Sequence, residues 1–115
     1  MNNEEAECAF LLDHNPNIKY WVRNLERNPQ HAFWLPTATD KFYPDFIARL
    51  HNGKILVVEY KGQHLDGSDA KEKEMIGKVW AEKSDNIFLM AWAKDQLGNS
   101  LESQINNCLS TNKIF

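Results

Sequence analysis

The sequence predicts an α/β fold in which a mixed β-sheet has helices on both faces. Two apolar runs of strand length, 42–50 and 54–62, flank a turn sequence at 51–53 and predict a β-hairpin. A helical pattern then separates this hairpin from another apolar run, 86–92. A helix between two strands of one sheet implies a crossover connection, so we expect the order helix, strands, hairpin, helix, strand, helix.

The composition limits the classes of function. The 115 residues are 43% hydrophobic and 25% charged, ordinary values for a globular chain, and we expect one domain over 1–115. No apolar window approaches the roughly 18 residues of a membrane span, and no export leader is visible, so we expect a cytoplasmic protein. Cys8 and Cys108 predict free thiols, and the histidines lack zinc-ligand spacing.

The N-terminal part predicts a helix and two further elements. An asparagine pair at 2–3 is suited to cap a helix that continues to about Asp13. The next segment, from Ile18 to the break at 28–29, fits an amphipathic helix, but its apolar residues also alternate as in a strand, and both interpretations stay open. The run 32–35 before a proline is most simply a strand.

The C-terminal part predicts two helices around a buried strand. After a loop over 62–68, a helix begins at Asp69, which has capping-box spacing to Glu72, and extends to about Lys83. The run 86–92 has the continuous apolar character of a strand buried on both faces. The residues expected to be buried are Met75, Ile76, Val79 and Trp80 in this helix, and Leu101, Ile105, Cys108 and Leu109 in a final helix.

The register of the central hairpin decides whether three polar side chains meet. A two-residue turn would put Asp45 and Glu59 on opposite faces of the sheet. A three-residue loop, 51–53, places Asp45 opposite Glu59 with Lys61 on the same face. We expect the three-residue loop, because its last residue needs a positive φ and Gly53 is placed there. Both faces of the hairpin also carry apolar residues, so helices should cover both.

Two opposed carboxylates in an apolar setting need a compensating charge. Directly opposed side chains lie about 5 Å apart at Cβ, where like charges are destabilising. Oxygen ligands suit Mg²⁺, for which Mn²⁺ can substitute, so Asp45 and Glu59 predict a divalent-cation site that Lys61 assists. The alternative is a simple ion pair of Lys61 with either acid, which leaves the register and the apolar setting unexplained.

The arrangement Pro44-Asp45 followed by Glu59-Tyr60-Lys61 resembles the PD-(D/E)xK nuclease superfamily. Most of the chain, to about Trp92, looks like the C-terminal endonuclease domain of type III restriction enzyme Res subunits. The positions that carry this closer resemblance are Glu5, Cys8-Ala9, Leu12-Asp13, Tyr43-Pro44-Asp45-Phe46, Val58-Glu59-Tyr60-Lys61-Gly62, Lys73 and Trp80.

The resemblance implies a restriction-endonuclease-like core and magnesium-dependent hydrolysis of double-stranded DNA in a restriction-modification setting. It implies Asp45 and Glu59 as metal ligands, with the backbone carbonyl of Tyr60 as a third. Lys61 would orient the attacking water and offset charge in the transition state. An acid of the first helix often joins such a site, and Glu5 is the matching position.

The net charge of −3 bears on DNA binding, because a free-standing DNA binder usually carries a basic excess. Lys41, Lys71, Lys73 and Lys78 are candidates for phosphate contacts. A helicase, translocase or methyltransferase partner would supply further affinity, since Res subunits carry a motor and this chain has no phosphate-binding Gly-rich loop. The chain is then either a stand-alone relative or part of a larger protein.

Two other functions compete with the nuclease. One is a non-catalytic nuclease-fold module that docks on a helicase or methyltransferase. The other is an unrelated α/β protein with a chance motif, which would be indicated if Asp45 and Glu59 lay on opposite faces of the sheet.

Overall fold

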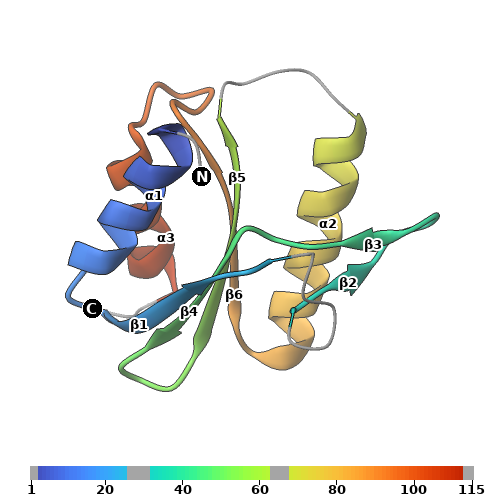
Figure 1. Cartoon of the computed structure of the whole chain (residues 1–115), viewed down its shortest axis with the longest axis horizontal. Helices are drawn as coiled ribbons and strands as arrows, with labels where there is room; N and C mark the ends of the chain where they lie inside the picture. The colour runs from blue at the N-terminus through green and yellow to red at the C-terminus, as the bar shows by residue number, and fades with distance from the viewer. Residues whose placement is uncertain (1–2, 26–31, 63–67, 113–115) are drawn as a thin grey trace.

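The computed structural model describes residues 3–25, 32–62 and 68–112, and it has the mixed sheet between helices that the sequence predicts. In chain order its elements are α1 (Asn3–His14), β1 (Ile18–Arg23), β2 (Leu35–Pro36), β3 (Lys41–Phe42), β4 (Phe46–Leu50), β5 (Ile55–Gly62), α2 (Ser68–Ser84), β6 (Ile87–Trp92) and α3 (Leu101–Thr111). Four strands form one sheet in the order β1-β4-β5-β6. β5 and β6 are parallel and are joined by the crossover helix α2, whereas the other neighbours are antiparallel. Figure 1 shows α1 and α3 on one face of the sheet, with α2 and the small β2-β3 hairpin on the other.

The segment from Ile18 to Arg23 is a strand, so the helical interpretation of this segment is wrong. The buried residues of this strand do not follow the simple alternation either, because the pairing with β4 shifts between Ile18 and Tyr20. This irregularity turns Ile18 and Trp21 toward the core and leaves Tyr20 and Val22 more than half exposed. One extra residue in a strand reverses the faces of all residues beyond it.

The strand expected at 32–35 is displaced toward the proline. Pairing begins only at Leu35, and Pro36 itself belongs to the two-residue strand β2, opposite Lys41 in β3. A proline is acceptable here because this is a two-stranded ribbon in which its missing N–H costs no central ladder bond. The break expected at 28–29 and nearly all of the loop expected at 62–68 lie outside the described residues.

The central hairpin has the register expected for a three-residue loop. Phe46 pairs with Val58, and the Leu50 N–H donates to the Lys54 carbonyl at 2.9 Å. Gly53 has a φ of 90°, a conformation that costs glycine little and side-chain-bearing residues much more. The prediction that glycine sets this register is confirmed.

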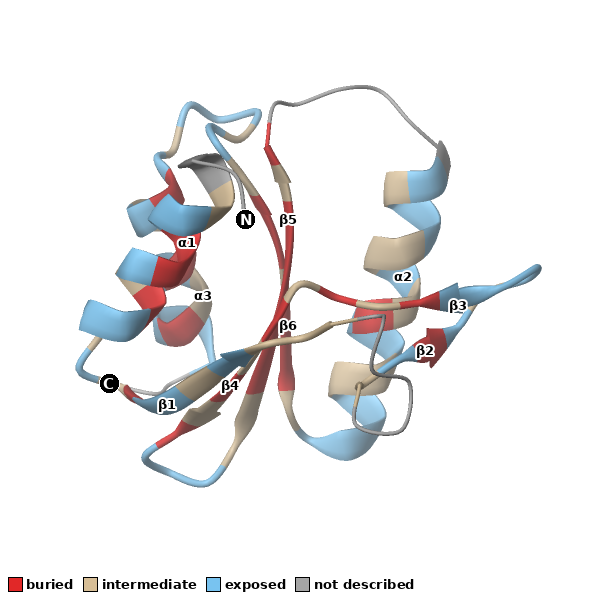
Figure 2. Ribbon diagram, viewed as in Figure 1, coloured by how far each residue is buried: buried red, intermediate tan, exposed pale blue. Residues whose placement is uncertain are grey.

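The sheet separates two cores, and β5 contributes to both. Leu56 and Val58 face α1 and α3, while Val57 packs with Phe42 and Phe88 on the α2 side. Figure 2 shows the buried residues concentrated along the middle of the sheet, between the two helical layers. By the same alternation, Glu59 and Lys61 follow Val57 on the α2 side, which is the face that the register predicted.

Helix α2 begins at Ser68, so Asp69 lies in its first turn and not at its cap. The buried stripe expected for this helix is half wrong. Ile76 and Trp80 pack on the second core, but Met75 is 68% exposed and Val79 is 45% exposed.

The orientation of α2 follows from a close approach at Gly77. A Cβ at this position would lie 2.5 Å from three atoms of the Phe88 ring, so the helix backbone rests directly on β6. Residues two positions away from Gly77 point about 200° around the helix, toward solvent. Final helix α3 buries Leu101, Ile105 and Leu109 as expected, whereas Cys108 is only partly buried. Its N-cap Ser100 accepts a hydrogen bond from the Ser103 N–H.

Two further expectations can be compared with the described residues. Both Cys8 and Cys108 are free thiols, as the sequence predicts. No helix in the described ranges is long and apolar enough to cross a bilayer.

Gly77→Ala should destabilise the protein, because the added methyl group meets the buried Phe88 ring. Alanine is favoured over glycine inside a helix by about 1 kcal/mol, but overpacking costs about 1–3 kcal/mol. We expect a net loss of about 1–2 kcal/mol in the free energy of unfolding, measured by urea titration. Met75→Ala on the exposed side of the same helix is the control and should change stability by less than about 0.5 kcal/mol. A Gly77→Ala protein as stable as the parent would contradict the close packing of α2.

Candidate functional site

The end of the central hairpin brings Asp45 and Glu59 together, with Lys61 beside Glu59. The paired residues of β4 and β5 end at Phe46 and Val58, and Asp45 and Glu59 are the next residues along the two segments. The Tyr60 N–H donates to Asp45 Oδ2 at 2.8 Å, which fixes this carboxylate against β5. The geometry that would have indicated a chance motif, with the two acids on opposite faces, is not what the structure has.

Glu59 is a buried acid whose hydrogen-bonding capacity is not filled. The residue is only 7% exposed, and Oε2 lies 3.6 Å from the Lys61 ammonium. Oε1 is fully buried and finds no hydrogen-bond donor among the described residues. A buried carboxylate oxygen without a donor is costly, so this atom indicates that a proton or a cation belongs beside it.

The electrostatics of Glu59 point the same way. Burial, the negative charge of Asp45 and a side-chain hydrogen bond with Asp45 together raise the pKa of Glu59 from 4.5 to about 8, against the opposing effect of Lys61 and Lys73. The hydrogen bond exists only when the Glu59 carboxyl is protonated and donates to Asp45. The raised pKa means that the pair of acids favours a proton, or another cation, over two free negative charges.

The residues present fit a divalent cation at this point. Asp45 and Glu59 supply hard oxygen ligands from two adjacent strands, and the Tyr60 carbonyl belongs to the residue between Glu59 and Lys61. The buried Glu59 Oε1, which has no donor among the described residues, is the ligand atom that a cation would satisfy. Two carboxylates plus water and substrate oxygens are a common ligand set for Mg²⁺.

Two lysines reach the site from different elements. Lys61 lies on β5, and Lys73 comes from α2, where its ammonium sits 5.3 Å from the centre of the Phe42 ring. Both contact the same oxygen, Oδ2 of Asp69, at 3.5 Å from Lys61 and 3.2 Å from Lys73. Burial lowers the pKa of Lys73, but the hydrogen bond with Asp69 and the charge of Glu59 outweigh it and raise this pKa.

Asp69 was missed as a site residue by the sequence interpretation, which used it only as a helix cap. Its hydrogen bond with Lys73 is the largest of the effects that lower its pKa, with the charge of Lys61 adding to it. The i,i+4 spacing of Asp69 and Lys73 was the available sequence signal. That spacing alone does not show that both residues face the hairpin, which depends on how α2 docks.

Asn24 is a second residue that the sequence did not single out. Its side-chain amide donates to the carbonyls of Phe33 and Pro44, at 2.7 and 2.8 Å, and its Oδ1 accepts from the Phe33 N–H at 2.8 Å. Its own N–H donates to the Asp45 carbonyl at 2.8 Å. Asn24 therefore ties the end of β1 to the Pro44-Asp45 turn and sets where Asp45 leaves the backbone.

The ligand role expected for Glu5 is not decided by its contacts. Glu5 forms an ion pair with Arg23 at 3.0 Å, and no group of three or more His, Cys, Asp or Glu side chains in the described ranges is arranged to hold a metal. Burial is the main cause that raises the pKa of the Cys8 thiol to about 12, with smaller contributions from Asp45, Glu7 and Glu5. Glu5 and Asp45 therefore both act on the Cys8 thiol. The role of Glu5 as a metal ligand stays a prediction.

The four lysines expected to contact DNA have different surroundings. Lys73 is the one that approaches the carboxylates, as described above. Lys41 sits over the Trp34 ring, 4.6 Å from its centre, and Lys78 pairs with Glu74 at 3.8 Å. Lys71 is exposed on α2. Their contacts with DNA stay predictions.

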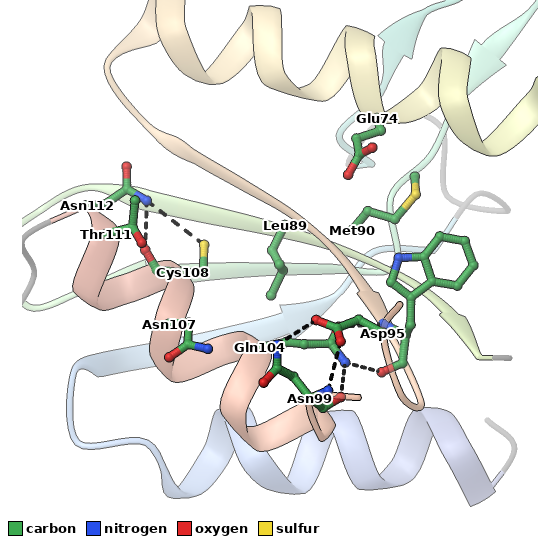
Figure 3. A pocket seen from close by; sticks show the side chains of 11 residues that line it. Glu74, Leu89, Met90, Asp95, Asn99, Gln104, Asn107, Cys108, Thr111 and Asn112 are labelled. Carbon is green, nitrogen blue, oxygen red and sulfur yellow. Dashed lines mark hydrogen bonds between the residues drawn. The ribbon is translucent and has the colours of Figure 1, made fainter. Parts of the chain in front are cut away.

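A separate pocket of about 400 Å³ lies along β6, between α2 and α3 (Figure 3). Its polar groups serve the fold. Gln104 accepts from the Trp92 N–H at 2.9 Å and donates to the Trp92 carbonyl at 2.8 Å, as a neighbouring strand would. Asp95 accepts from the backbone of Leu97 and Asn99 and stabilises the turn before α3. This pocket contains none of the three motif residues.

No family model, curated protein or solved structure gives a significant match to this chain.

Replacing Asn24 should weaken the fold around the Pro44-Asp45 turn. Asn24→Ala removes three side-chain hydrogen bonds and leaves partly buried backbone groups without partners. We expect a loss of about 2–4 kcal/mol in the free energy of unfolding, measured by urea titration. Asn107→Ala, at an exposed position on α3, is the control. A cost for Asn24→Ala no larger than that of the control would show that the turn does not depend on Asn24.

The raised pKa of Glu59 predicts a decline of stability with pH in EDTA. From pH 4.5 to about 8 the folded state keeps the Glu59 proton that the unfolded chain has released, so the stability contribution is lost as pH rises through this window. Glu59→Gln cannot ionise and keeps a donor toward Asp45. The unfolding free energy of the parent should therefore fall by roughly 2–4 kcal/mol more than that of Glu59→Gln over this window.

The comparison uses urea titrations at both ends of this pH window. Glu82→Gln, an exposed acid on α2, should retain the decline of the parent. An identical decline in the parent and in Glu59→Gln would refute the raised pKa.

Proposed function

We propose that this chain is a metal-dependent endonuclease that hydrolyses phosphodiester bonds of double-stranded DNA and belongs to the PD-(D/E)xK class. The single observation that carries the proposal is the buried Glu59 carboxylate, opposite Asp45 and beside Lys61, with one oxygen that lacks a donor among the described residues. A surface ion pair would not explain why Glu59 is buried or why the register brings it to Asp45. A cation bound between the two carboxylates would explain both.

The fold is consistent with this proposal. The sheet is mixed, carries helices on both faces and places the motif residues at the end of its two central strands. We infer that this arrangement is a restriction-endonuclease-like core. The polar ends of central strands are common positions for reactive groups, because the buried strands fix the side chains precisely.

Each residue of the motif has a role in the proposed reaction. Asp45 and Glu59 would hold Mg²⁺ or Mn²⁺, with the Tyr60 carbonyl as a further ligand. Bound metal supplies Lewis-acid stabilisation of developing charge and a template for in-line attack on phosphorus. Lys61 lies between the carboxylates of Glu59 and Asp69, at 3.6 and 3.5 Å, so its ammonium is suited to orient water and to offset charge on the phosphate.

A second candidate function is a non-catalytic nuclease-fold module that docks on a helicase, translocase or methyltransferase subunit in the cytoplasm. The observation that favours it is the charge distribution. The chain has a net charge of −3, and Lys61, Lys73 and Lys78 all contact acids of the same molecule. Affinity for DNA would then come largely from the partner.

Nicking of supercoiled plasmid in Mg²⁺ tests the proposed function. We expect the parent protein to nick the plasmid and EDTA to stop the reaction. Lys61→Ala should lower the rate by about 100-fold, because it removes a charge that acts on the transition state. Lys83→Ala, an exposed lysine in the last turn of α2, is the control and should retain the rate of the parent.

Equal rates for the parent and Lys61→Ala would remove Lys61 from the mechanism. A protein that fails to bind Mg²⁺ by calorimetry and instead forms a stable complex with a helicase or methyltransferase subunit would support the docking module.

A further inference from the structure

Two lysines that are distant in sequence converge on a single carboxylate oxygen. The ammonium groups of Lys61 and Lys73 lie 3.5 and 3.2 Å from Oδ2 of Asp69. Lys61 projects from β5 and Lys73 from the second turn of α2, so the two cations are held by different layers of the fold. Convergence of two positive charges on one oxygen is the arrangement by which proteins bind phosphate oxygens.

The two lysines are more fixed than surface lysines usually are. Their side chains are 21% and 24% exposed, and the Phe42 ring packs against Lys73 at 5.3 Å from its ammonium. Asp69 differs, because its side chain is 68% exposed. The cations thus form a partly buried floor, and the anion that they hold lies on the solvent side.

Asp69 competes with any negatively charged substrate for the two lysines, because the site has no spare positive charge. Lys61 contacts Glu59 as well as Asp69, and Lys73 contacts Asp69, so both ammonium groups already have acidic neighbours. A phosphate added to this set would meet lysines that are already neutralised and an acid that repels it. A phosphate that replaces Asp69 keeps the balance of charge and gains both lysines.

We propose that Lys61 and Lys73 form an anion site for a backbone phosphate of DNA, and that Asp69 occupies this site as an internal counter-ion until the phosphate displaces it. The inference rests on the proposed function for the nature of its ligand. It selects Lys73 from the four lysines expected to contact DNA, pairs it with Lys61, and adds Asp69 as a residue that limits affinity. Because Asp69 is exposed and lies in the first turn of α2, its side chain can turn to water without disturbing the core.

Binding of a fluorescein-labelled 20-base-pair duplex in EDTA, followed by fluorescence anisotropy, tests the inference without cleavage. Asp69→Asn should bind about threefold to tenfold more tightly than the parent. The matched control is Glu74→Gln, which removes one negative charge from the i,i+4 partner of Lys78 on the same helix. This control should change affinity by less than about twofold, because the Lys78–Glu74 pair is long, exposed and screened by solvent, so it restrains Lys78 little.

The salt dependence separates a phosphate contact from a general charge effect. Asp69→Asn should steepen the dependence of log K on log salt concentration by about one. Adding Lys73→Gln to Asp69→Asn should cancel both the gain in affinity and the gain in slope. Thermal melts of all variants establish that each is folded, and Asp69→Ser serves as a second variant with the same expected gain.

Equal gains in Asp69→Asn and Glu74→Gln would overturn the inference, and so would the absence of duplex binding by Asp69→Asn. The outcome is separate from that of the nicking assay. A protein that nicks plasmid without a specific effect of Asp69 retains the proposed function and loses this inference. A protein with the Asp69 effect but no nicking in Mg²⁺ retains the anion site and loses the nuclease.

Discussion

The burial of Glu59 opposite Asp45 is the constraint on which the rest of the site depends. A carboxylate that is 7% exposed has lost most of its water, and a second carboxylate across the strand pair adds repulsion. The fold tolerates this loss of hydration and this repulsion because the register leaves no other position for Glu59. Gly53 fixes the loop, the loop fixes the pairing of β4 with β5, and the apolar residues on both faces of the hairpin prevent a slip by one residue.

The surrounding elements then act on this pair from three directions. The Tyr60 N–H holds one oxygen of Asp45, and Asn24 holds the backbone on both sides of it. Helix α2 brings positive charge from the other layer, in the form of Lys73, together with the acid Asp69 that balances it. The close contact of Gly77 with the Phe88 ring sets the rotation of α2, and a different rotation would turn Lys73 away from Glu59.

The parts of the fold that were predictable from sequence are those governed by local rules. The hairpin register follows from one glycine, and β6 follows from a continuous apolar run of strand length. The segment at Ile18 was ambiguous because a shift in pairing, which depends on β4, breaks its alternation. The exposed positions of Met75 and Val79 and the meeting of Lys61 with Asp69 depend on how α2 docks on the sheet. No pattern within the helix specifies that docking, because the decisive contact is made by a glycine.

The docking of α2 places Lys73 with Lys61 beside a pair of acids, so acidic and basic side chains share one site. In our proposal the carboxylate pair binds a cation and the two lysines bind an anion, so the site has two neighbouring regions of opposite charge. Lys61 belongs to both, since it contacts Glu59 on one side and Asp69 on the other. The proposed hydrolysis of a phosphodiester would use this division, because a metal ion and the phosphate that it polarises would have to bind side by side. A chain with a net charge of −3 achieves it by position and not by total charge, and Lys61 is the residue that links the two regions.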